Sequence, residues 1–542
     1  MICRSALNTD TINVVLVNYP YVSSVVKYPI GLINLKNILD KSCNNIRTNI
    51  VDFNRLINDK SIAVESFKNK DYNLLSSYIL SYSPHIIGFS TIAISLDIVL
   101  ELSSFIKSQH PELIIFLGGP AASVSYARLL QDFTCIDYIL LGESESCIES
   151  TIITASAGAS FQDIRANIAF RDGEEICEKH DAPDVVLDKL PYLDLSGYSD
   201  LSEIDIEIGR GCPFNCYFCA TSIFWHRKYE VKSVHRLIGE IEYYIMEYGI
   251  VNFNFIHDLL TYDRDFIIDF CKEILNKKIK INWACSARAD YLDNEMIEYM
   301  YIAGCNHIFI GIESGSNRMQ RIIQKNLNVE TLYDIFTVLS QYQISLTVSF
   351  VYGFPEEEQS DLIDTLKLIQ CLNDKFGCKV VLSRCTLYPN TTVYLQNAEN
   401  VNTFLPSGDY LALHNAEPSE LIVNNKELFP CFFCLDNQRE YPHLDVFINF
   451  YIRLIKATLP NFYLCLSDKY SYYELYSIFY HLNERLDPYT RELYEKRSTK
   501  REYFIVLYDL LREEVESNDH FDKRIREAFC FDMLLLSHST AL

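Results

Sequence analysis

The sequence predicts an α/β protein in which two parallel β-sheets follow one another and a mainly helical region comes last. Three observations support this fold class. From about residue 10 to 395, short runs of β-branched and apolar residues alternate with segments whose apolar positions have helical spacing. Glycine-containing turns directly follow several of these runs. Beyond about residue 396 the alternation stops, and aromatic residues recur at helical spacing instead.

The first region contains five strand-like runs, each followed by a helical pattern, which predicts a parallel, doubly wound sheet. The runs lie at residues 12–17, 49–52, 85–90, 113–117 and 136–141. Such sheets bind ligands beyond the carboxyl ends of their strands. Three loops follow strands directly and are the candidate binding loops: Ser90-Thr91, Gly118-Gly119-Pro120 and Gly142-Glu143-Ser144-Glu145. A Gly-Gly-Pro turn alone is weak evidence, because tight turns need glycine for structural reasons.

A connector is predicted at residues 156–200, between a first domain at 1–155 and a second at 201–395. It begins with a short hairpin at 167–176 whose turn is Asp172-Gly173, and a polar, proline-containing stretch follows. The second domain repeats the strand-then-helix pattern. Its six predicted strands are the run that contains Ile204, Ile206 and Ile208, and residues 253–258, 280–285, 307–312, 346–350 and 380–383.

The last region, 396–542, is predicted to be a helical domain that caps the second one or selects the substrate. Its amphipathic runs include residues 446–455 and 491–497. Cys431 and Cys434 flank two phenylalanines and have no second cysteine pair nearby. We therefore interpret them as core residues rather than as an auxiliary metal site.

The chain has the composition of a globular protein of two or three domains, at 542 residues with 49% hydrophobic and 22% charged residues. Its apolar stretches are too short and too interrupted to cross a bilayer, and no basic segment leads into an apolar one near the amino terminus. The 18 cysteines are spread along the sequence, which favours a reduced protein over a disulfide scaffold. These features predict a cytoplasmic location without membrane association.

The net charge of −24, from 48 basic and 72 acidic residues, disfavours a nucleic-acid substrate. An acidic surface repels phosphate backbones, and no Lys/Arg cluster indicates a local basic groove. A compact or cationic substrate fits better.

Cys212, Cys216 and Cys219 are the strongest functional signal. Three thiols within eight residues can hold an iron–sulfur cubane and leave its fourth iron without a protein ligand, free to bind a small molecule. The alternatives are half a zinc site or free thiols, but no Cys/His pair lies at finger spacing nearby. The loop follows a predicted strand, and active sites of β/α barrels lie at the carboxyl ends of strands.

The cysteine spacing, with Phe218 before the last cysteine, resembles the signature of the radical SAM superfamily. The resemblance implies a [4Fe-4S] cluster whose open iron chelates S-adenosylmethionine (SAM), on a partial (β/α)6 barrel. It also implies SAM contacts at the ends of later strands. Asp258 would lie near the amino group, with Leu259 where relatives have a second acid, and Arg288 would pair with the carboxylate through its bidentate fork.

Two further loops are assigned by the same resemblance. In the run from Gly311 to Gly315, the contacts would come from Glu313 and Ser314, near the ribose or the methionyl amine. Gly353 and Pro355 belong to a turn beside the adenine. Asn390 replaces a glycine in a Tyr-Pro-Gly-Thr-type turn, and asparagine tolerates a left-handed backbone. For each of these residues the alternative is an ordinary solvated loop.

The first region resembles the cobalamin-binding domain that precedes many radical SAM domains. The resemblance rests on Tyr28-Pro29-Ile30-Gly31-Leu32, Gly88-Phe89-Ser90, Gly118-Gly119-Pro120 and Gly142-Glu143-Ser144-Glu145. It implies a Rossmann-like, flavodoxin-like fold and cobalamin contacts from Ser90, Thr91, Gly118, Gly119, Pro120, Gly142 and Glu143. The alternative is a flavodoxin-like domain that has lost its ligand.

No Asp-x-His-x-x-Gly motif is present, so the implied cobalt has no histidine ligand. His85 precedes a strand core and His110 lies in a turn, so both are expected to be structural.

Together the resemblances imply a cobalamin-dependent radical SAM enzyme, served by a flavodoxin- or ferredoxin-type electron donor. In such methyltransferases a 5′-deoxyadenosyl radical takes hydrogen from the substrate, and methylcobalamin then supplies the methyl group. We expect a C-methyltransferase that acts on an unactivated carbon of a peptide or small natural-product precursor. The alternative outcome is a cyclisation, rearrangement or oxidation without methyl transfer. A non-catalytic cobalamin carrier is a third possibility, which the intact cysteine triad opposes.

Overall fold

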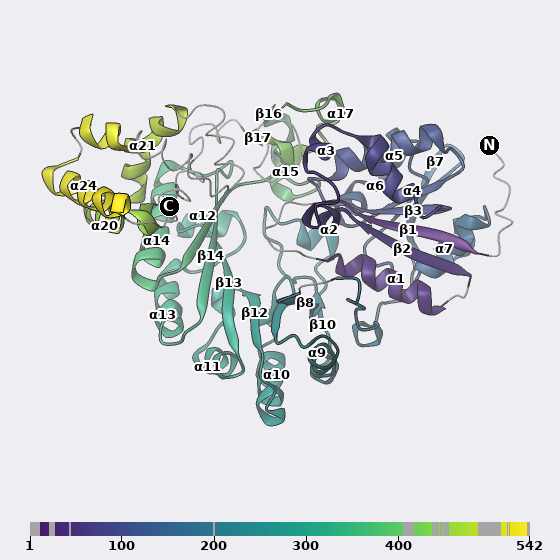
Figure 1. Cartoon of the computed structure of the whole chain (residues 1–542), viewed down its shortest axis with the longest axis horizontal. Coiled ribbons are helices and arrows are strands. Elements are labelled where there is room, and N and C mark those ends of the chain that lie inside the picture. The colour runs from purple at the N-terminus through teal and green to yellow at the C-terminus, as the bar shows by residue number, and fades with distance from the viewer. Residues whose placement is uncertain are drawn as a thin grey trace.

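The computed structural model describes residues 11–20, 28–42, 45–198, 201–404, 417–435, 438, 444, 448, 455–485, 511–517, 519 and 521–538. Two sheet-based halves lie beside one another, and helices from the end of the chain pack on the second half (Figure 1). Of the predicted helical run at 446–455 only residues 448 and 455 belong to the described part, and the run at 491–497 lies outside it.

The first sheet has the strand order β2-β1-β3-β4-β5-β6-β7, and its first five strands are parallel. This confirms the predicted doubly wound, flavodoxin-like arrangement. The parallel strands are β1 (Ile12–Asn18), β2 (Ile46–Asp52), β3 (Ile86–Ser90), β4 (Ile114–Gly118) and β5 (Tyr138–Leu140).

Helices cover both faces of this sheet because alternate strand residues point to opposite sides. Val14, Leu16 and Ile86 pack with α1 (Ile30–Ser42) and α7 (Ile148–Ser156). The neighbouring residues of the same strands pack on the other face with α4 (Tyr72–Leu80), α5 (Leu96–Gln109) and α6 (Pro120–Asp132). The short helices α2 (Phe53–Asn58) and α3 (Glu65–Lys68) complete this half.

The predicted connector hairpin forms β6 (Asn167–Asp172) and β7 (Glu175–His180). β6 pairs antiparallel with β5, and β7 pairs with β6. The hairpin therefore extends the first sheet by two strands.

The second sheet has six parallel strands, the number predicted, in the order β15-β14-β13-β12-β11-β8. Its strands are β8 (Ile204–Glu207), β11 (Asn252–Ile256), β12 (Asn282–Ala287), β13 (Cys305–Glu313), β14 (Ser345–Tyr352) and β15 (Lys379–Arg384). β8 and β15 lie at opposite ends of this order, so the barrel is partial and open. The helices between the strands are α9 (Val234–Tyr248), α10 (Arg264–Lys277), α11 (Asn294–Ile302), α12 (Asn317–Ile322), α13 (Val329–Leu339) and α14 (Gln359–Phe376).

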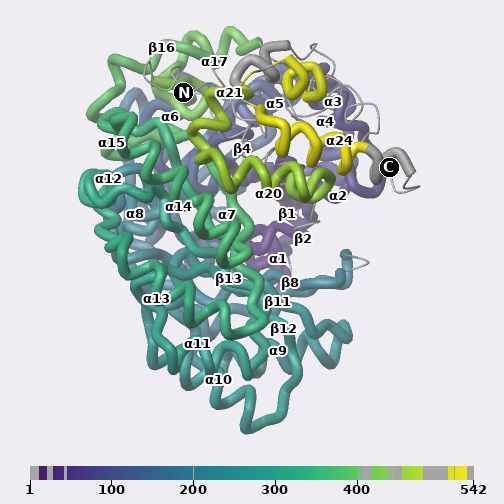
Figure 2. The backbone as a smooth tube through the Cα atoms, turned by 90° about the vertical axis from the view of Figure 1, so that its left-hand side faces the viewer, coloured from purple at the N-terminus to yellow at the C-terminus, as the bar shows by residue number. Residues whose placement is uncertain are grey.

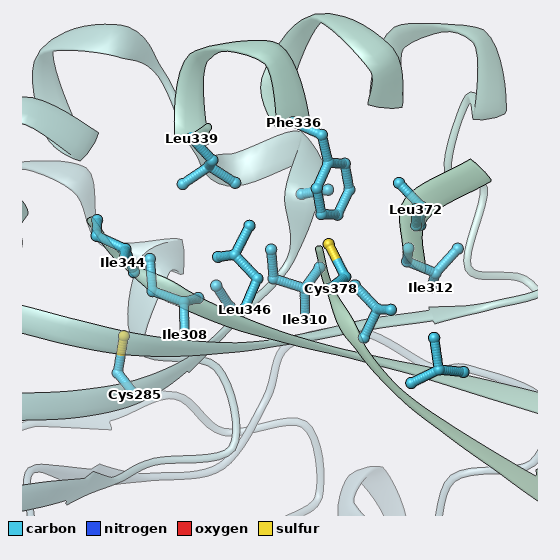
Figure 3. Close-up of a cluster of buried hydrophobic side chains, with 14 of the residues drawn as sticks. Cys285, Ile308, Ile310, Ile312, Phe336, Leu339, Ile344, Leu346, Leu372 and Cys378 are labelled. Carbon is cyan, nitrogen blue, oxygen red and sulfur yellow. The ribbon is translucent and has the colours of Figure 1, made fainter. Parts of the chain in front are cut away.

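The core of the barrel shows why these residues form strands. Ile308, Ile310 and Ile312 are spaced two apart on β13, so all three point to the same face. Figure 3 shows them beside Phe336 and Leu339 of α13. Burial of such side chains is worth about 1.5–3 kcal/mol each, which fixes the register of the strand.

The carboxyl-terminal region packs in two places. β16 (Val401–Phe404) pairs antiparallel with β17 (Phe433–Leu435), near α15 (Thr392–Asn397) and α17 (Glu420–Asn424), and its apolar residues join the core of the first sheet. Cys431 and Cys434 are buried here, as predicted for core residues. The later helices pack on one another and, through α21 (Tyr472–Arg485), on α14 (Figure 2). They are α19 (Lys456–Thr458), α20 (Pro460–Lys469), α21 (Tyr472–Arg485) and α24 (Lys523–His538).

No helix in the described part of the chain combines the length and the apolar character that a membrane span requires.

Candidate active site

The cysteine loop runs from β9 (Gly209–Arg210) to α8 (Thr221–Phe224). β9 pairs antiparallel with β10 (Glu230–Val231), so the segment before the cysteine loop lies beside the segment that follows α8. Cys212, Cys216 and Cys219 all have free thiols and are partly exposed. Burial raises the pKa of the Cys212 thiol to about 11, and the charges of the other two cysteines add to the rise. The three thiols are therefore close enough to interact, as a shared ligand requires.

The arrangement of these thiols is compatible with an iron–sulfur cubane. Among the residues that the structure describes, no three side chains of His, Cys, Asp or Glu converge on one point at metal-ligand distance. In a cubane each cysteine binds a different iron atom, so the three thiols need not converge on one point. The residues present therefore fit the predicted cluster.

Asp258 holds the start of the loop. Its Oδ2 accepts the backbone N–H of Gly211 at 2.9 Å, and its Oδ1 accepts the Thr221 hydroxyl at 3.5 Å. Gly211 has a φ of 84°, and a Cβ there would lie 2.1 Å from the Lys228 carbonyl oxygen, so only glycine fits. Burial raises the pKa of Asp258. Both oxygens thus serve the loop, and the contact of Asp258 with the SAM amino group stays a prediction.

The second half of the loop is tied to the end of the barrel. The Tyr217 N–H donates to the Ile323 carbonyl at 3.0 Å, and the Tyr217 hydroxyl donates to Glu356 Oε1 at 2.9 Å. The rings of Phe218 and Phe354 lie 5.6 Å apart between centroids. The predicted aromatic residue therefore packs against the turn after β14.

Arg288 follows β12 and lies over the ring of Phe214, 4.2 Å from its centroid, inside the cysteine loop. Its Nε and Nη2 donate to the Asp290 carboxylate at 3.0 and 2.9 Å, and Nη2 also donates to the Lys325 carbonyl at 2.7 Å. Two of the three guanidinium nitrogens are therefore already engaged within the protein. The bidentate pairing with SAM stays a prediction, and it would require Arg288 to exchange these partners.

Lys325 is a site residue that sequence reasoning missed. Its Nζ donates to Glu313 Oε1 at 2.8 Å, and both side chains are buried. Burial raises the pKa of the Cys216 thiol, and the charge of Lys325 opposes this rise. Glu313 itself has a φ of 71°, and the strand register shifts just before it. In the sequence Lys325 stands in a short polar run, which is typical of a solvated turn.

The other predicted SAM contacts lie at neighbouring strand ends. Ser314 is fully buried, and its Oγ lies 3.2 Å from the Thr365 hydroxyl. The Gly353 N–H donates to Glu357 Oε2 at 2.6 Å, and Pro355 lies partly exposed in the same turn. The first loop is held by α14, and the second is closed by Glu357, which stands two residues before that helix. Contact with SAM stays a prediction for all three.

Asn390 adopts the left-handed backbone that its sequence position predicts, with a φ of 64°. Its Nδ2 donates to the Val124 carbonyl at 2.8 Å, in α6 of the first half. The turn thus bridges the two halves.

The candidate cobalamin loops lie at the carboxyl ends of β3, β4 and β5. Ser90 ends β3, and the hydroxyl of Thr91 donates to the Gly118 carbonyl at 2.8 Å. Gly119 has a φ of 90°, and a Cβ there would lie 2.6 Å from the Thr91 carbonyl oxygen. Pro120 then begins α6. Together these residues form a close, preorganised pair of turns.

The third of these loops meets the cysteine loop directly. The Gly142 N–H donates to Ser123 Oγ at 3.1 Å, which fixes the turn. Arg210 donates to Glu143 Oε1 at 2.6 Å and to Glu145 Oε1 at 2.5 Å. Arg210 stands two residues before Cys212 and was not among the predicted residues. Its partners are distant in sequence, and periodicity carries no signal for such a pair.

The two histidines of residues 1–155 lie away from these loops. Nδ1 of His85 accepts the Asn13 N–H at 3.0 Å, at the amino end of the sheet. His110 is partly exposed, 3.4 Å from Glu112. Both have the structural surroundings that we expected.

Two protein-family models match the chain. The B12 binding domain matches residues 64–151, and the radical SAM superfamily matches residues 206–369. The first match covers the loops after β3, β4 and β5, and the second covers the cysteine loop and four of the strand ends that follow. The two matches confirm the predicted cofactors, which are a [4Fe-4S] cluster, SAM and cobalamin.

Among curated proteins, the chain is 23% identical over 331 residues to an uncharacterized methyltransferase of Pyrococcus horikoshii, covering 59% of this chain and 71% of that one. It is 25% identical over 314 residues to the anaerobic magnesium-protoporphyrin IX monomethyl ester cyclase of Cereibacter sphaeroides, covering 54% of this chain. The chain spans half the length of that cyclase.

Among solved structures, the fold is similar to that of the cobalamin-dependent SAM radical enzyme OxsB with aqua-cobalamin and SAM bound. The TM-score is 0.62 at 18% identity, and the match covers 97% of this chain and 79% of OxsB. The likeness extends over the helical carboxyl-terminal region as well as both sheets. With a B12-binding domain and a radical SAM domain in one chain, the protein belongs to the cobalamin-dependent radical SAM enzymes.

Proposed function

We propose that this enzyme is a C-methyltransferase that transfers a methyl group to an unactivated carbon of a peptide or small natural-product precursor. When bound, SAM and the iron–sulfur cluster supply a 5′-deoxyadenosyl radical, and cobalamin supplies the methyl group. The electron for the cluster would come from a flavodoxin- or ferredoxin-type donor.

The observation that carries the proposal is the direct contact between the two sets of loops. Glu143, in the loop after β5, is paired with Arg210 beside the first cysteine. Asn390, after β15, donates to Val124 in α6. A methyl group can reach a substrate radical only if both cofactor sites open on a common space, and these contacts support such an arrangement.

The chain's own residues would bind and orient the cofactors and exclude water. The three cysteines would hold the cluster, and Asp258 and Tyr217 fix the two ends of their loop. Rings of Phe214, Tyr262 and Tyr291 pack against one another beside that loop. Such an apolar wall limits the access of water to a reactive intermediate. No side chain need act as an acid or base.

The first test needs no substrate. The anaerobically reconstituted enzyme is reduced with hydroxocobalamin bound and incubated with SAM carrying a CD3 methyl group, and the cobalamin is then analysed by mass spectrometry. We expect CD3-cobalamin to form, because a methyltransferase must reload its methyl donor from SAM. Candidate precursors are then added, and the CD3 group should move into the product.

The matched control is Cys216→Ala, which leaves two thiols for the cluster. This variant should make no deoxyadenosine, yet it should keep cobalamin, because the cobalamin loops belong to the other half of the chain. Wild-type enzyme that makes deoxyadenosine without any methylated cobalamin or product would contradict the proposal.

A second candidate function is a cyclisation, rearrangement or oxidation without methyl transfer. The likeness to a monomethyl ester cyclase favours it. In that case the same assay would yield deoxyadenosine and a product of unchanged carbon number.

A further inference from the structure

Arg210 joins three carboxylates that come from both halves of the chain. Its Nη1 donates to Glu143 Oε1 at 2.6 Å and its Nη2 to Glu145 Oε1 at 2.5 Å, both in the loop after β5. Its Nε and Nη2 donate to the two oxygens of Glu207 at 2.8 and 3.0 Å, at the end of β8. The guanidinium also lies 5.8 Å from the Trp225 ring centroid. One side chain thus holds three segments together.

We propose that Arg210 is a positioning residue that sets the distance and orientation between the cobalamin loop and the cysteine loop. This inference rests on the family's two cofactors but not on methyl transfer. It also assigns the carboxylate of Glu143 to Arg210, so that the backbone of the Gly142-Glu143 turn is the part of this loop left to contact cobalamin.

The charge balance shows why the contact is specific. The Arg210 side chain is 7% exposed, and those of Glu143, Glu145 and Glu207 are 18%, 9% and 17% exposed. Burial alone would lower the pKa of Arg210, but the charges of Glu145 and Glu207 raise it above its ordinary value. One cation therefore faces three anions that are largely removed from water. Without it, the anions would repel one another and draw water into the junction.

A fourth carboxylate strengthens the argument. Glu230, in β10, lies opposite Arg210 in the backbone register of the β9–β10 ladder, and its side chain is exposed. Burial raises the pKa of Glu230, and the charge of Glu143 adds to the rise. The junction is therefore rich in negative charge, and Arg210 is the cation that every one of these groups shares.

The position of Arg210 in the chain couples it to the cluster site. Gly211 is fixed by Asp258 and Cys212 follows at once, so a shift of Arg210 is transmitted to the first thiol. On the other side, Glu143 and Glu145 flank Ser144 in one short turn. A shift of either loop thus changes the geometry of both cofactor sites.

The test compares four variants of the full chain and one combination of two of them. Arg210→Gln removes the positive charge. Arg210→Lys keeps the charge but loses the guanidinium group that donates to several carboxylates at once. Glu143→Gln/Glu145→Gln removes the two negative charges in the loop after β5. Arg264→Gln is the matched control, because Arg264 also pairs with two carboxylates, Asp293 and Glu295, within the barrel alone.

The first readout is hydrogen exchange of the chain without cofactors. We expect Arg210→Gln and Glu143→Gln/Glu145→Gln each to speed exchange in both residues 141–147 and 208–213 by about tenfold, and Arg264→Gln to change neither. When Arg210→Gln is added to the Glu143→Gln/Glu145→Gln chain, it should increase the exchange rate by less than half as much as it does in the wild-type chain. Arg210 and the two glutamates act as one unit, so the effects of removing them do not add.

The second readout is the magnetic interaction between cob(II)alamin and the reduced cluster, measured by electron paramagnetic resonance at equal cofactor content. A merely structural role would lower cofactor content and leave this interaction unchanged. We expect Arg210→Gln and Glu143→Gln/Glu145→Gln to broaden or weaken it, with Arg210→Lys intermediate.

The proposal would be overturned if Arg210→Gln speeds hydrogen exchange only in residues 208–213, or if it leaves the magnetic interaction unchanged. If Arg210→Gln fails to fold, the Arg210→Lys and Glu143→Gln/Glu145→Gln chains decide it. Neither readout uses substrate, so a failure of the methyltransferase proposal is seen separately in the CD3 assay.

Discussion

The carboxylate of Asp258 accepts the backbone N–H of Gly211 at 2.9 Å, so the end of β11 fixes the residue immediately before the first cysteine. This contact competes with the role in SAM binding that the family resemblance gives Asp258. A pair of variants separates the two roles.

We expect Asp258→Ala to weaken retention of the iron–sulfur cluster by roughly tenfold, because an unpaired buried N–H costs about 1–3 kcal/mol. Asp258→Asn should retain the cluster, because an amide oxygen can still accept from Gly211. Iron content and visible absorbance after anaerobic reconstitution measure both. If both variants keep iron and both lose SAM affinity, the main role of Asp258 is to bind SAM.

Gly119→Ala should destabilise the first domain by about 2–4 kcal/mol and abolish cobalamin binding. The φ of 90° strains any side chain, and the new Cβ would lie 2.6 Å from the Thr91 carbonyl oxygen. Gly31→Ala is the control for stability alone, since a Cβ added to this residue of helix α1 would meet no atom within 4 Å. Denaturant midpoints and cobalamin titration test this. A Gly119→Ala chain as stable as the wild type would contradict the close approach of residue 119 to the Thr91 carbonyl.

Glu357 should make stability fall as pH rises. Burial raises its pKa to about 7 from an ordinary 4.5. Its Oε1 is buried with no hydrogen-bond partner among the described residues, so the folded chain favours the protonated form. This contribution is fully present below about pH 4.5 and is lost as the pH rises to about 7.

Glu357→Gln should therefore be more stable than the wild type at pH 8 by about 1–2 kcal/mol, after allowing for solvent screening, and nearly equal to it at pH 4.5. Thermal unfolding at both pH values measures this. Glu298→Gln, on the exposed face of α11, is the control and should show no such difference. A wild type that is the more stable chain at pH 8 would contradict the assignment.

Bound cobalamin should be base-off with no histidine on its lower face. His85 and His110 are the only histidines of residues 1–155, and neither follows a strand of the first sheet. Loss of an axial nitrogen makes cob(II)alamin easier to reduce to the cob(I) nucleophile that SAM methylates. An electron paramagnetic resonance spectrum of the cob(II)alamin form tests this, because superhyperfine splitting from an axial nitrogen would refute it.

The sequence predicted the strands well because their signal is local. Alternation such as Ile204, Ile206 and Ile208 reflects one buried face, and the left-handed turn at Asn390 follows from the residue type. Arg210 and Lys325 could not be predicted in the same way. Their roles depend on partners up to 67 positions away, and periodicity says nothing of which charged residues meet after folding.

The β6–β7 hairpin covers the edge of β5, which should limit self-association of the first sheet. β5 is short and fully buried, and without the hairpin the N–H and C=O groups along its backbone edge would be open to pairing with another chain. The hairpin moves the open edge to β7, where Glu175, Glu178 and His180 are exposed. Charged side chains on an outer strand discourage edge-to-edge aggregation, so we expect a cobalamin-binding fragment that extends past His180 to aggregate less than one that ends at residue 155.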